Sequence, residues 1–246
     1  MHELMNSFKI YFHNFQSIDE KKKSILFIPG AGMDHRFIRA LKLPEQEYNQ
    51  PLVIDLPGHG KTQGSSHNVI NSYGQFLVDA LAQFNLQNLI LCGHSMGGLI
   101  ALDMIINHGF EAKSLLLLNS IYPTRVSDPL IEKAKLGNGY AADFIIKFGL
   151  YKKLIGIKNI FPQEDALVML SDLEACNNFQ LTQKDLQSLK LPISIILGDK
   201  DKLVNLKEVD NFSSHTSSNI YTINEVGHFP FFENPVELSN LITSVT

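Results

Sequence analysis

The sequence predicts an α/β protein in which a mostly parallel central sheet is flanked by helices. Short apolar runs alternate along the chain with segments whose apolar residues recur at helical spacing. The runs are continuously apolar, which is typical of strands covered on both faces. Their alternation with helices favours right-handed crossover connections, and therefore parallel strands.

The expected elements follow in chain order. Strands are predicted at residues 8–15, 24–30, 52–60, 86–93, 114–120, 192–199 and 219–229, the first of them at an edge. Helices are predicted at 69–84, directly after Ser95, and at 234–245. The last helix opens with Asn234 as its N-cap and Pro235 at its first position.

The interval from residue 121 to residue 190 breaks this alternation. It contains no clear strand pattern, and stretches such as YAADFIIKFGLYKKLIG and QEDALVMLSDLEACNNF have helical spacing. We therefore predict a helical insertion at 121–190, the lid segment, over one edge of the sheet. Residues 1–120 and 191–246 are predicted to form the core domain.

Size, charge and cysteine content limit the class of protein. The 246 residues suffice for one sizeable core, and the net charge of −4 with scattered Lys and Arg argues against nucleic acid or an anionic membrane as main partner. The N-terminus has no signal pattern, and no run reaches the about 18 apolar residues of a membrane span. Cys92 and Cys176 make no disulfide framework, and Cys92 is expected in the core. These features predict a cytoplasmic protein.

Ser95 lies in CGHSMGG, between an apolar strand and a helical pattern, where parallel sheets bind ligands. A sharp turn there strains the central residue and crowds the positions two residues away, which Gly93 and Gly97 occupy. The same pattern fits a serine that only caps the helix. A phosphate-binding loop is disfavoured, because the stretch has neither the P-loop Lys-Ser/Thr nor a spaced GxGxxG.

A nucleophilic serine needs a base, and the base needs an orienting acid. His228, in VGHFPFFENP after the last predicted strand, is the strongest candidate base, and a packed core histidine is the alternative. His94 is expected to point away from Ser95, whereas His35 and His59 follow strand ends and could line a site.

The acid is expected in LGDKDKLV, directly after an apolar strand, where Asp199 and Asp201 are both available. Asp201 lies further into the loop and can reach back toward His228. Either carboxylate could instead be a solvated turn residue. The occurrence of Ser, Asp and His in this order at separate strand ends favours a nucleophilic triad.

The motifs around these residues resemble those of the α/β-hydrolase superfamily, whose triad also follows the chain order Ser, Asp, His. The resemblance covers nearly the whole chain. GHSMGG resembles the nucleophile elbow with Ser95, DLPGHG the loop after the fourth strand, and VGHFPFFENP the histidine loop. GDKDKLV matches the acid loop G-x-x-D-x-x-V, which selects Asp201 over Asp199. The resemblance implies the α/β-hydrolase fold, with residues 121–190 as its variable lid.

IPGAGMD resembles the loop that supplies half of the oxyanion hole. Family members often have His-Gly where Pro29-Gly30 stands here. The resemblance therefore implies the backbone N–H of Ala31 as the first donor, with Gly32 as its neighbouring alternative, and the N–H of Met96 as the second.

The resemblance is to lid-bearing serine carboxylesterases, including those that cleave pimeloyl-carrier-protein methyl ester. It implies hydrolysis of a small-molecule carboxylic ester, of short to medium acyl chain, through an acyl-enzyme, with no metal or organic cofactor. A thioesterase, C–C-bond hydrolase, lyase or perhydrolase would use the same triad, and a non-catalytic ligand-binding member is a further alternative. Dehalogenases and epoxide hydrolases are disfavoured because they carry Asp at the elbow. The sequence indicates no oligomeric state.

Overall fold

The central sheet consists of five parallel strands in the order β3-β5-β6-β7-β8. The computed structural model describes all residues except 1, 6–7 and 162–165. The strands are β3 (Ile25–Ile28), β5 (Ile90–His94), β6 (Ser114–Leu118), β7 (Ile193–Gly198) and β8 (Asn219–Ile223). The first four are buried along their whole length, as their continuous apolar runs predict. The predicted parallel α/β sheet is confirmed.

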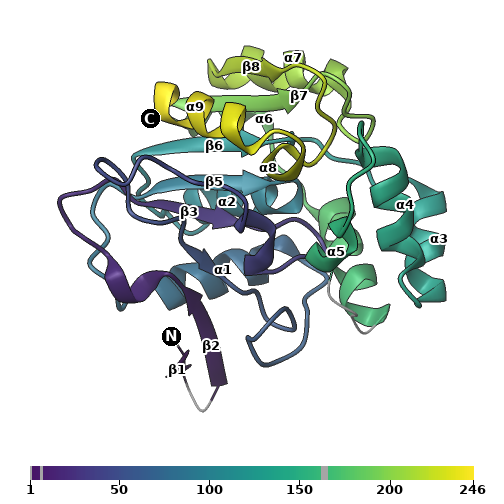
Figure 1. Ribbon diagram of the computed structural model, residues 1–246, viewed down its shortest axis with the longest axis horizontal. Helices are drawn as coiled ribbons and strands as arrows, with labels where there is room; N and C mark the ends of the chain where they lie inside the picture. Colours follow the sequence, from purple (N-terminus) through teal and green to yellow (C-terminus); the bar gives the residue numbers. More distant parts are fainter. Residues whose placement is uncertain (1, 6–7, 162–165) are drawn as a thin grey trace.

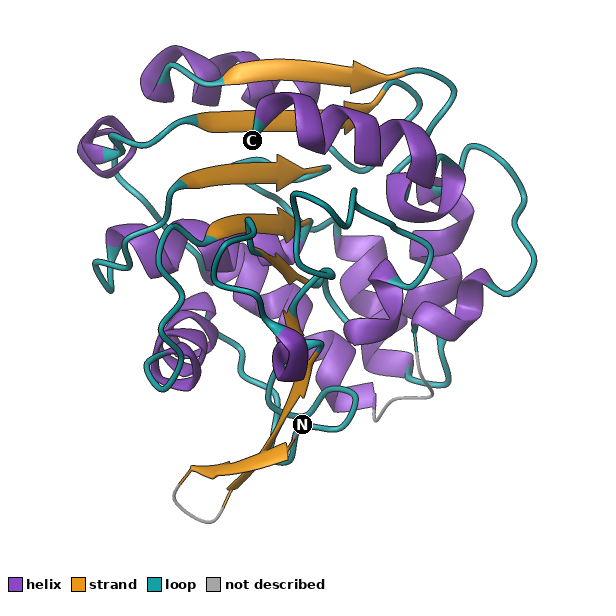
Figure 2. Cartoon of the chain, turned by 60° about the vertical axis from the view of Figure 1, so that its left-hand side comes forward, coloured by secondary structure: helices purple, strands orange, loops and turns teal. Residues whose placement is uncertain are grey.

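A second, antiparallel sheet has the order β1-β2-β4. It contains β1 (His2–Met5), β2 (Phe8–His13) and β4 (Val53–Ile54). The Phe27 N–H in β3 donates to the carbonyl of Leu52, the residue before β4, at 2.8 Å. The strand expected at 8–15 is present as β2, but its expected place at an edge is wrong, because β1, which was not predicted, pairs with it on one side and β4 on the other. The strand expected at 52–60 is far shorter. Figure 2 shows β1 and β2 extending away from the body of the molecule.

Helices cover both faces of the parallel sheet. Figure 1 shows α9 (Pro235–Val245) in front of it and α1 (Ile70–Leu81) and α2 (Met96–Ile106) behind. Helix α2 buries every residue from Met96 to Met104, because it packs on the central strands and against α1. The predicted cap of α9 is confirmed, since the Asn234 side chain accepts the Glu237 N–H at 3.2 Å. The remaining core elements are η1 (Phe15–Ser17), η2 (His35–Ile38), α7 (Leu206–Thr216) and α8 (Pro230–Glu233).

The described part of the lid segment is helical and contains no strand. Its elements are α3 (Asp128–Leu136), α4 (Tyr140–Gly149), η3 (Ile157–Ile160), α5 (Ala166–Asn178) and α6 (Gln183–Ser188). The start of the helical pattern expected from residue 163 falls outside the described residues. In Figure 1 the arrowheads of the parallel strands point toward α3, α4 and α5, so these helices lie beyond the carboxyl ends of the strands. The domain boundaries at 121 and 190 stay a prediction.

Burial of both cysteines accompanies this packing. Cys92 in β5 is 1% exposed, which confirms its expected place in the core, and Cys176 in α5 is 5% exposed. Within the described residues, no helix is both long and apolar enough to span a membrane.

Candidate active site

Ser95 is the single residue between β5 and α2, and its backbone is strained. Its φ is 51° and its ψ is −120°, and a positive φ of this kind costs a non-glycine residue about 1–3 kcal/mol. The Ser95 N–H donates to the carbonyl of Leu118 at 3.1 Å, and the Ser120 hydroxyl donates to the carbonyl of Ser95 at 2.6 Å. The end of β6 therefore holds the turn. The Ser95 hydroxyl makes no capping hydrogen bond to α2, so capping does not account for this serine.

The glycines around Ser95 are required by close approach. A Cβ at Gly93 would collide with the backbone of Gly97, and a Cβ at Gly97 would collide with the carbonyl of Ile28 in β3. A Cβ at Gly98 would collide with the side chain of Ser120. The sharp turn thus fits only with small residues at these positions, as the sequence pattern predicts.

His228 and Asp201 lie in contact with each other. His228 Nδ1 is 2.8 Å from Asp201 Oδ2, and both side chains are at most 5% exposed. Asp201 Oδ2 also accepts from Asn119 Nδ2 at 2.7 Å, and Oδ1 accepts the Leu203 N–H at 2.7 Å. Burial alone would raise the pKa of Asp201, but the nearby His228 and these donors lower it to about 2. Asp201 is therefore an ionised acceptor that fixes the orientation of the imidazole.

The backbone of His228 is held from two sides. Its N–H donates to the carbonyl of Gly149, at the end of α4, at 2.6 Å. Its carbonyl accepts from His94 Nε2 at 2.8 Å. A Cβ at Gly227 would collide with the carbonyl of Gly149, so this glycine permits the close approach of α4.

Ser95 and His228 line one cavity of about 290 Å³ between the sheet and the lid segment. Its other lining residues are mostly apolar and include Ala31, Met33, Ile121, Leu130, Phe144, Ile145, Phe161, Leu173 and Cys176. The contacts of the described residues include no hydrogen bond between the Ser95 hydroxyl and His228, and such bonds often tighten only when substrate binds. Asp201 and Met96 do not line the cavity. Asp201 contacts His228 Nδ1, and Met96 follows Ser95 as a buried residue.

The geometry separates the two candidate donors of the IPGAGMD loop. The Gly32 N–H donates to Asp172 Oδ2 at 2.8 Å and is therefore occupied. Ala31 lines the cavity, and no hydrogen-bond partner for its N–H occurs among the described residues. Met96 is the first residue of α2, where an N–H has no acceptor within the helix. These contacts leave the N–H groups of Ala31 and Met96 without an acceptor among the described residues, and their role as oxyanion donors stays a prediction.

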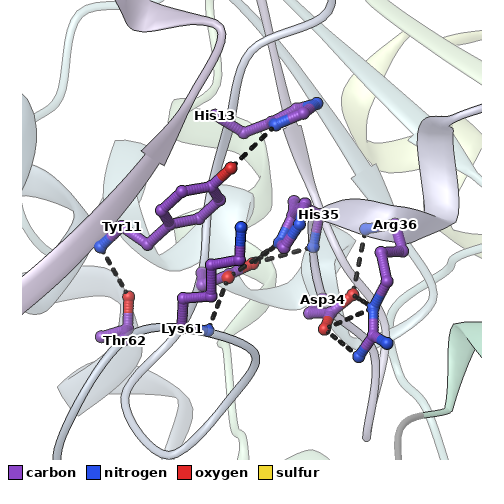
Figure 3. Close-up of polar contacts among 8 residues, drawn as sticks. Tyr11, His13, Asp34, His35, Arg36, Lys61 and Thr62 are labelled. Carbon is purple, nitrogen blue, oxygen red and sulfur yellow. Dashed lines mark hydrogen bonds and ion pairs between the residues drawn. The ribbon is translucent and has the colours of Figure 1, made fainter. Parts of the chain in front are cut away.

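The other candidate residues have different partners. Asp199 is exposed, forms an ion pair with Lys200 at 2.8 Å and behaves as a turn carboxylate. His35 Nδ1 contacts Asp55 at 2.9 Å, and Figure 3 shows His35 beside Tyr11, His13 and Lys61. His59 Nε2 contacts Asp172 at 2.8 Å. Neither His35 nor His59 lines the cavity.

Sequence reasoning missed two polar residues of this region, Asn119 and Asp172. Asn119 directly follows the apolar run of β6, so the strand-end argument that selects Asp201 could have found it. Asp172 is a carboxylate within a mostly apolar helical pattern, between Leu170 and Leu173. A charge on an apolar helix face is itself a signal, because burial of a carboxylate requires partners.

Comparisons with known proteins agree with this architecture. Residues 25–241 match the model of the alpha/beta hydrolase family. The chain is 25% identical over 244 residues to a pimeloyl-acyl-carrier-protein methyl ester esterase of Wigglesworthia glossinidia brevipalpis, covering 89% of this chain and 92% of that protein. It is 22% identical over 228 residues to 3-oxoadipate enol-lactonase 1 of Acinetobacter baylyi, covering 88% of this chain and 85% of that one.

Among solved structures, an esterase from Exiguobacterium antarcticum superposes with a TM-score of 0.86 at 20% identity. The superposition covers 96% of this chain and 95% of that one, which confirms the predicted fold. The family model spans most of the chain, from β3 to α9. The chain therefore belongs to the alpha/beta hydrolase family.

Proposed function

We propose that this hydrolase cleaves carboxylic esters of short to medium acyl chain through an acyl-enzyme on Ser95. The observation that carries the proposal is that His228, paired with Asp201 at 2.8 Å, lines the same cavity as Ser95. A base fixed by an ionised acid, beside a hydroxyl at a strained turn, is the arrangement that activates a serine.

The proposed reaction has two halves. The Ser95 oxygen attacks the acyl carbon while His228 Nε2 takes its proton, and Asp201 stabilises the resulting imidazolium through Nδ1–H. The oxyanion accepts hydrogen bonds from the N–H groups of Ala31 and Met96. His228 then protonates the leaving alcohol. Water attacks the acyl-enzyme with His228 again as base, which releases the acid and restores Ser95.

Substrate class is inferred from the cavity and the relatives. The walls of the cavity are mostly apolar, which suits an acyl chain, and the cavity volume of about 290 Å³ favours chains of limited length. The relatives are named as an esterase and an enol-lactonase, and a lactone is a cyclic ester. We also propose that residues 121–190 act as a lid over this cavity, and that the chain, with its two free buried thiols, works in the cytoplasm.

The experiment is a substrate panel with a covalent probe. Purified protein is assayed with p-nitrophenyl acetate, butyrate and octanoate, with acyl thioesters, and with a fluorophosphonate probe, alongside Ser95→Ala. We expect turnover of the esters, stronger than of the thioesters, and labelling of the wild type only. A folded wild type that neither turns over any ester nor reacts with the probe would refute the proposal. Faster cleavage of thioesters than of esters would show that the substrates are thioesters, and it would still support the proposed triad.

A further inference from the structure

Asp172 brings a fully buried carboxylate from the lid segment into the core. It lies in α5 and is 0% exposed. Its Oδ2 is 2.8 Å from the Gly32 N–H and 2.8 Å from His59 Nε2, and its Oδ1 accepts from the Tyr73 hydroxyl at 2.6 Å. Burial of a carboxylate is unfavourable unless donors surround it, and here three donors from three separate core segments do so.

We propose that Asp172 is a positioning residue that holds the oxyanion loop in its working conformation. This inference rests on the proposed ester hydrolysis. The N–H of Gly32 and the carbonyl of Ala31 belong to one rigid peptide plane. The hydrogen bond from Gly32 to Asp172 therefore fixes the plane that follows Ala31, the residue whose own N–H faces the oxyanion.

The loop needs such an anchor because of its composition. Gly30 and Gly32 flank Ala31, and Gly32 has a φ of 68°, in the region that favours glycine. Glycines allow many backbone conformations, so a loop of this composition is not held by local preference alone. An acceptor fixed by the core selects one of these conformations.

The core holds Asp172 through His59 and Tyr73. His59 Nδ1 is 3.0 Å from the carbonyl of Pro57. The ring thus lies between two acceptors, the Pro57 carbonyl and Asp172. The Tyr73 oxygen accepts the His67 N–H at 2.8 Å and donates its own hydrogen to Asp172. Asp172 is therefore fixed independently of the Gly32 contact.

The same helix also bounds the acyl cavity. Leu173, the next residue, and Cys176, one turn further on, both line it. Helix α5 therefore lines the cavity proposed for the acyl chain and also contacts the oxyanion loop through Asp172. In this arrangement the lid segment does more than cover the cavity, because it contributes to the geometry in which the oxyanion is bound.

The test compares Asp172→Asn with Tyr73→Phe. Gly32 and His59 both contact Oδ2 of Asp172, and Tyr73 contacts Oδ1. Asp172→Asn replaces the charged acceptor by a neutral amide oxygen, which accepts a weaker hydrogen bond, and it places an NH₂ group beside a donor, so we expect the Gly32 contact to loosen. Loss of a full oxyanion donor lowers kcat by about 10²–10³-fold, and we expect a misplaced one to lower kcat by about 10–100-fold with KM within about twofold. Tyr73→Phe removes a donor to the same carboxylate but leaves the Gly32 bond, so we expect its kcat to stay within about threefold of wild type.

Two further measurements make the outcome specific. Inhibition by a trifluoromethyl ketone, which forms an oxyanion on the serine, should weaken in Asp172→Asn in parallel with kcat/KM. Hydrogen exchange of the Gly32 amide, protected in the wild type, should become faster in Asp172→Asn and not in Tyr73→Phe. If Asp172→Asn does not fold, Asp172→Glu, which keeps the charge but displaces it, takes its place with the same expectations.

The results separate this inference from the proposed function. Asp172→Asn with wild-type kcat, or equal losses of kcat in both variants, would overturn the positioning role. A wild type that is inactive but has a protected Gly32 amide would refute ester hydrolysis. The Asp172–Gly32 contact would then be confirmed, and its role in binding an oxyanion would be refuted.

Discussion

His94 donates a hydrogen bond from Nε2 to the backbone carbonyl of His228 at 2.8 Å, with the two imidazole rings 4.8 Å apart. His94 directly precedes Ser95, so the strand that carries the serine also holds the loop that carries the proposed base. Burial lowers the pKa of His94 well below its usual range, and the neighbouring His228 lowers it further. His94 is therefore a neutral donor.

Replacement of His94 by Phe should release the histidine loop. The variant leaves the buried carbonyl of His228 without its donor, which costs about 1–3 kcal/mol of the free energy of unfolding. We expect kcat to fall by about 10-fold or more, because the base then samples other positions. His94→Gln, which can present an amide N–H to the same carbonyl, is the control and should recover most of both quantities. Equal activity of the Phe variant and the wild type would contradict this role.

Two substitutions of Ser95 should separate its chemistry from its strain. Ser95→Ala and Ser95→Gly both remove the hydroxyl, and each should lower kcat by about 10⁶-fold if the triad acts as a unit. Only glycine also relieves the φ of 51°. We therefore expect Ser95→Gly to be more stable than Ser95→Ala by about 1 kcal/mol or more in urea denaturation. A less stable glycine variant would show that the turn stores no strain.

Asp201 should make stability depend on acid pH. Its pKa is lowered from 3.8 to about 2 in the folded protein, so its contribution is present above pH 3.8 and is lost as the pH falls through about 2. This shift corresponds to about 2 kcal/mol. Asp201→Asn should remove that part of the pH dependence of unfolding and lower kcat by about 10⁴-fold, as in other triads. Asp199→Asn is the matched control on the same loop, and its kcat should match that of the wild type.

The wall of the cavity should set the preferred acyl length. Phe144 of α4 lines the cavity, whereas Phe148, one turn further on and 38% exposed, does not. We expect Phe144→Ala to raise the ratio of kcat/KM for octanoate over acetate esters by about 10-fold, because it makes room for further methylenes. Phe148→Ala should leave that ratio unchanged. If Phe144→Ala and Phe148→Ala had the same ratio of octanoate to acetate kcat/KM, the acyl chain would not lie against Phe144.

Local patterns predicted much of the fold and the main candidate residues. Continuous apolar runs located β3, β5, β6 and β7, since burial on both faces leaves no polar alternation. The order of Ser95, Asp201 and His228 at strand ends was readable because parallel strands bring their carboxyl ends to one edge.

The parts that were missed depend on contacts distant in sequence. Asp172 and Gly32 are 140 residues apart, and nothing in the periodicity of either segment indicates the other. Asn119, the further donor to Asp201, is separated from it by 82 residues. The predicted strand at 52–60 shrinks to β4 because the following residues turn back to bond Asp55, whose Oδ2 accepts the Lys61 N–H at 2.9 Å.

The rates at which a thiol reagent modifies the two cysteines report on how the molecule opens. Cys92 lies in the central strand β5 and Cys176 in the cavity wall, and burial raises the pKa of both thiols, so neither reacts readily with a thiol reagent in the closed protein. We expect Cys92 to be modified only when the sheet opens, whereas Cys176 should be modified whenever the cavity that it lines opens to the reagent. The ratio of the two modification rates, followed by mass spectrometry, therefore measures how often the cavity wall opens while the core remains intact.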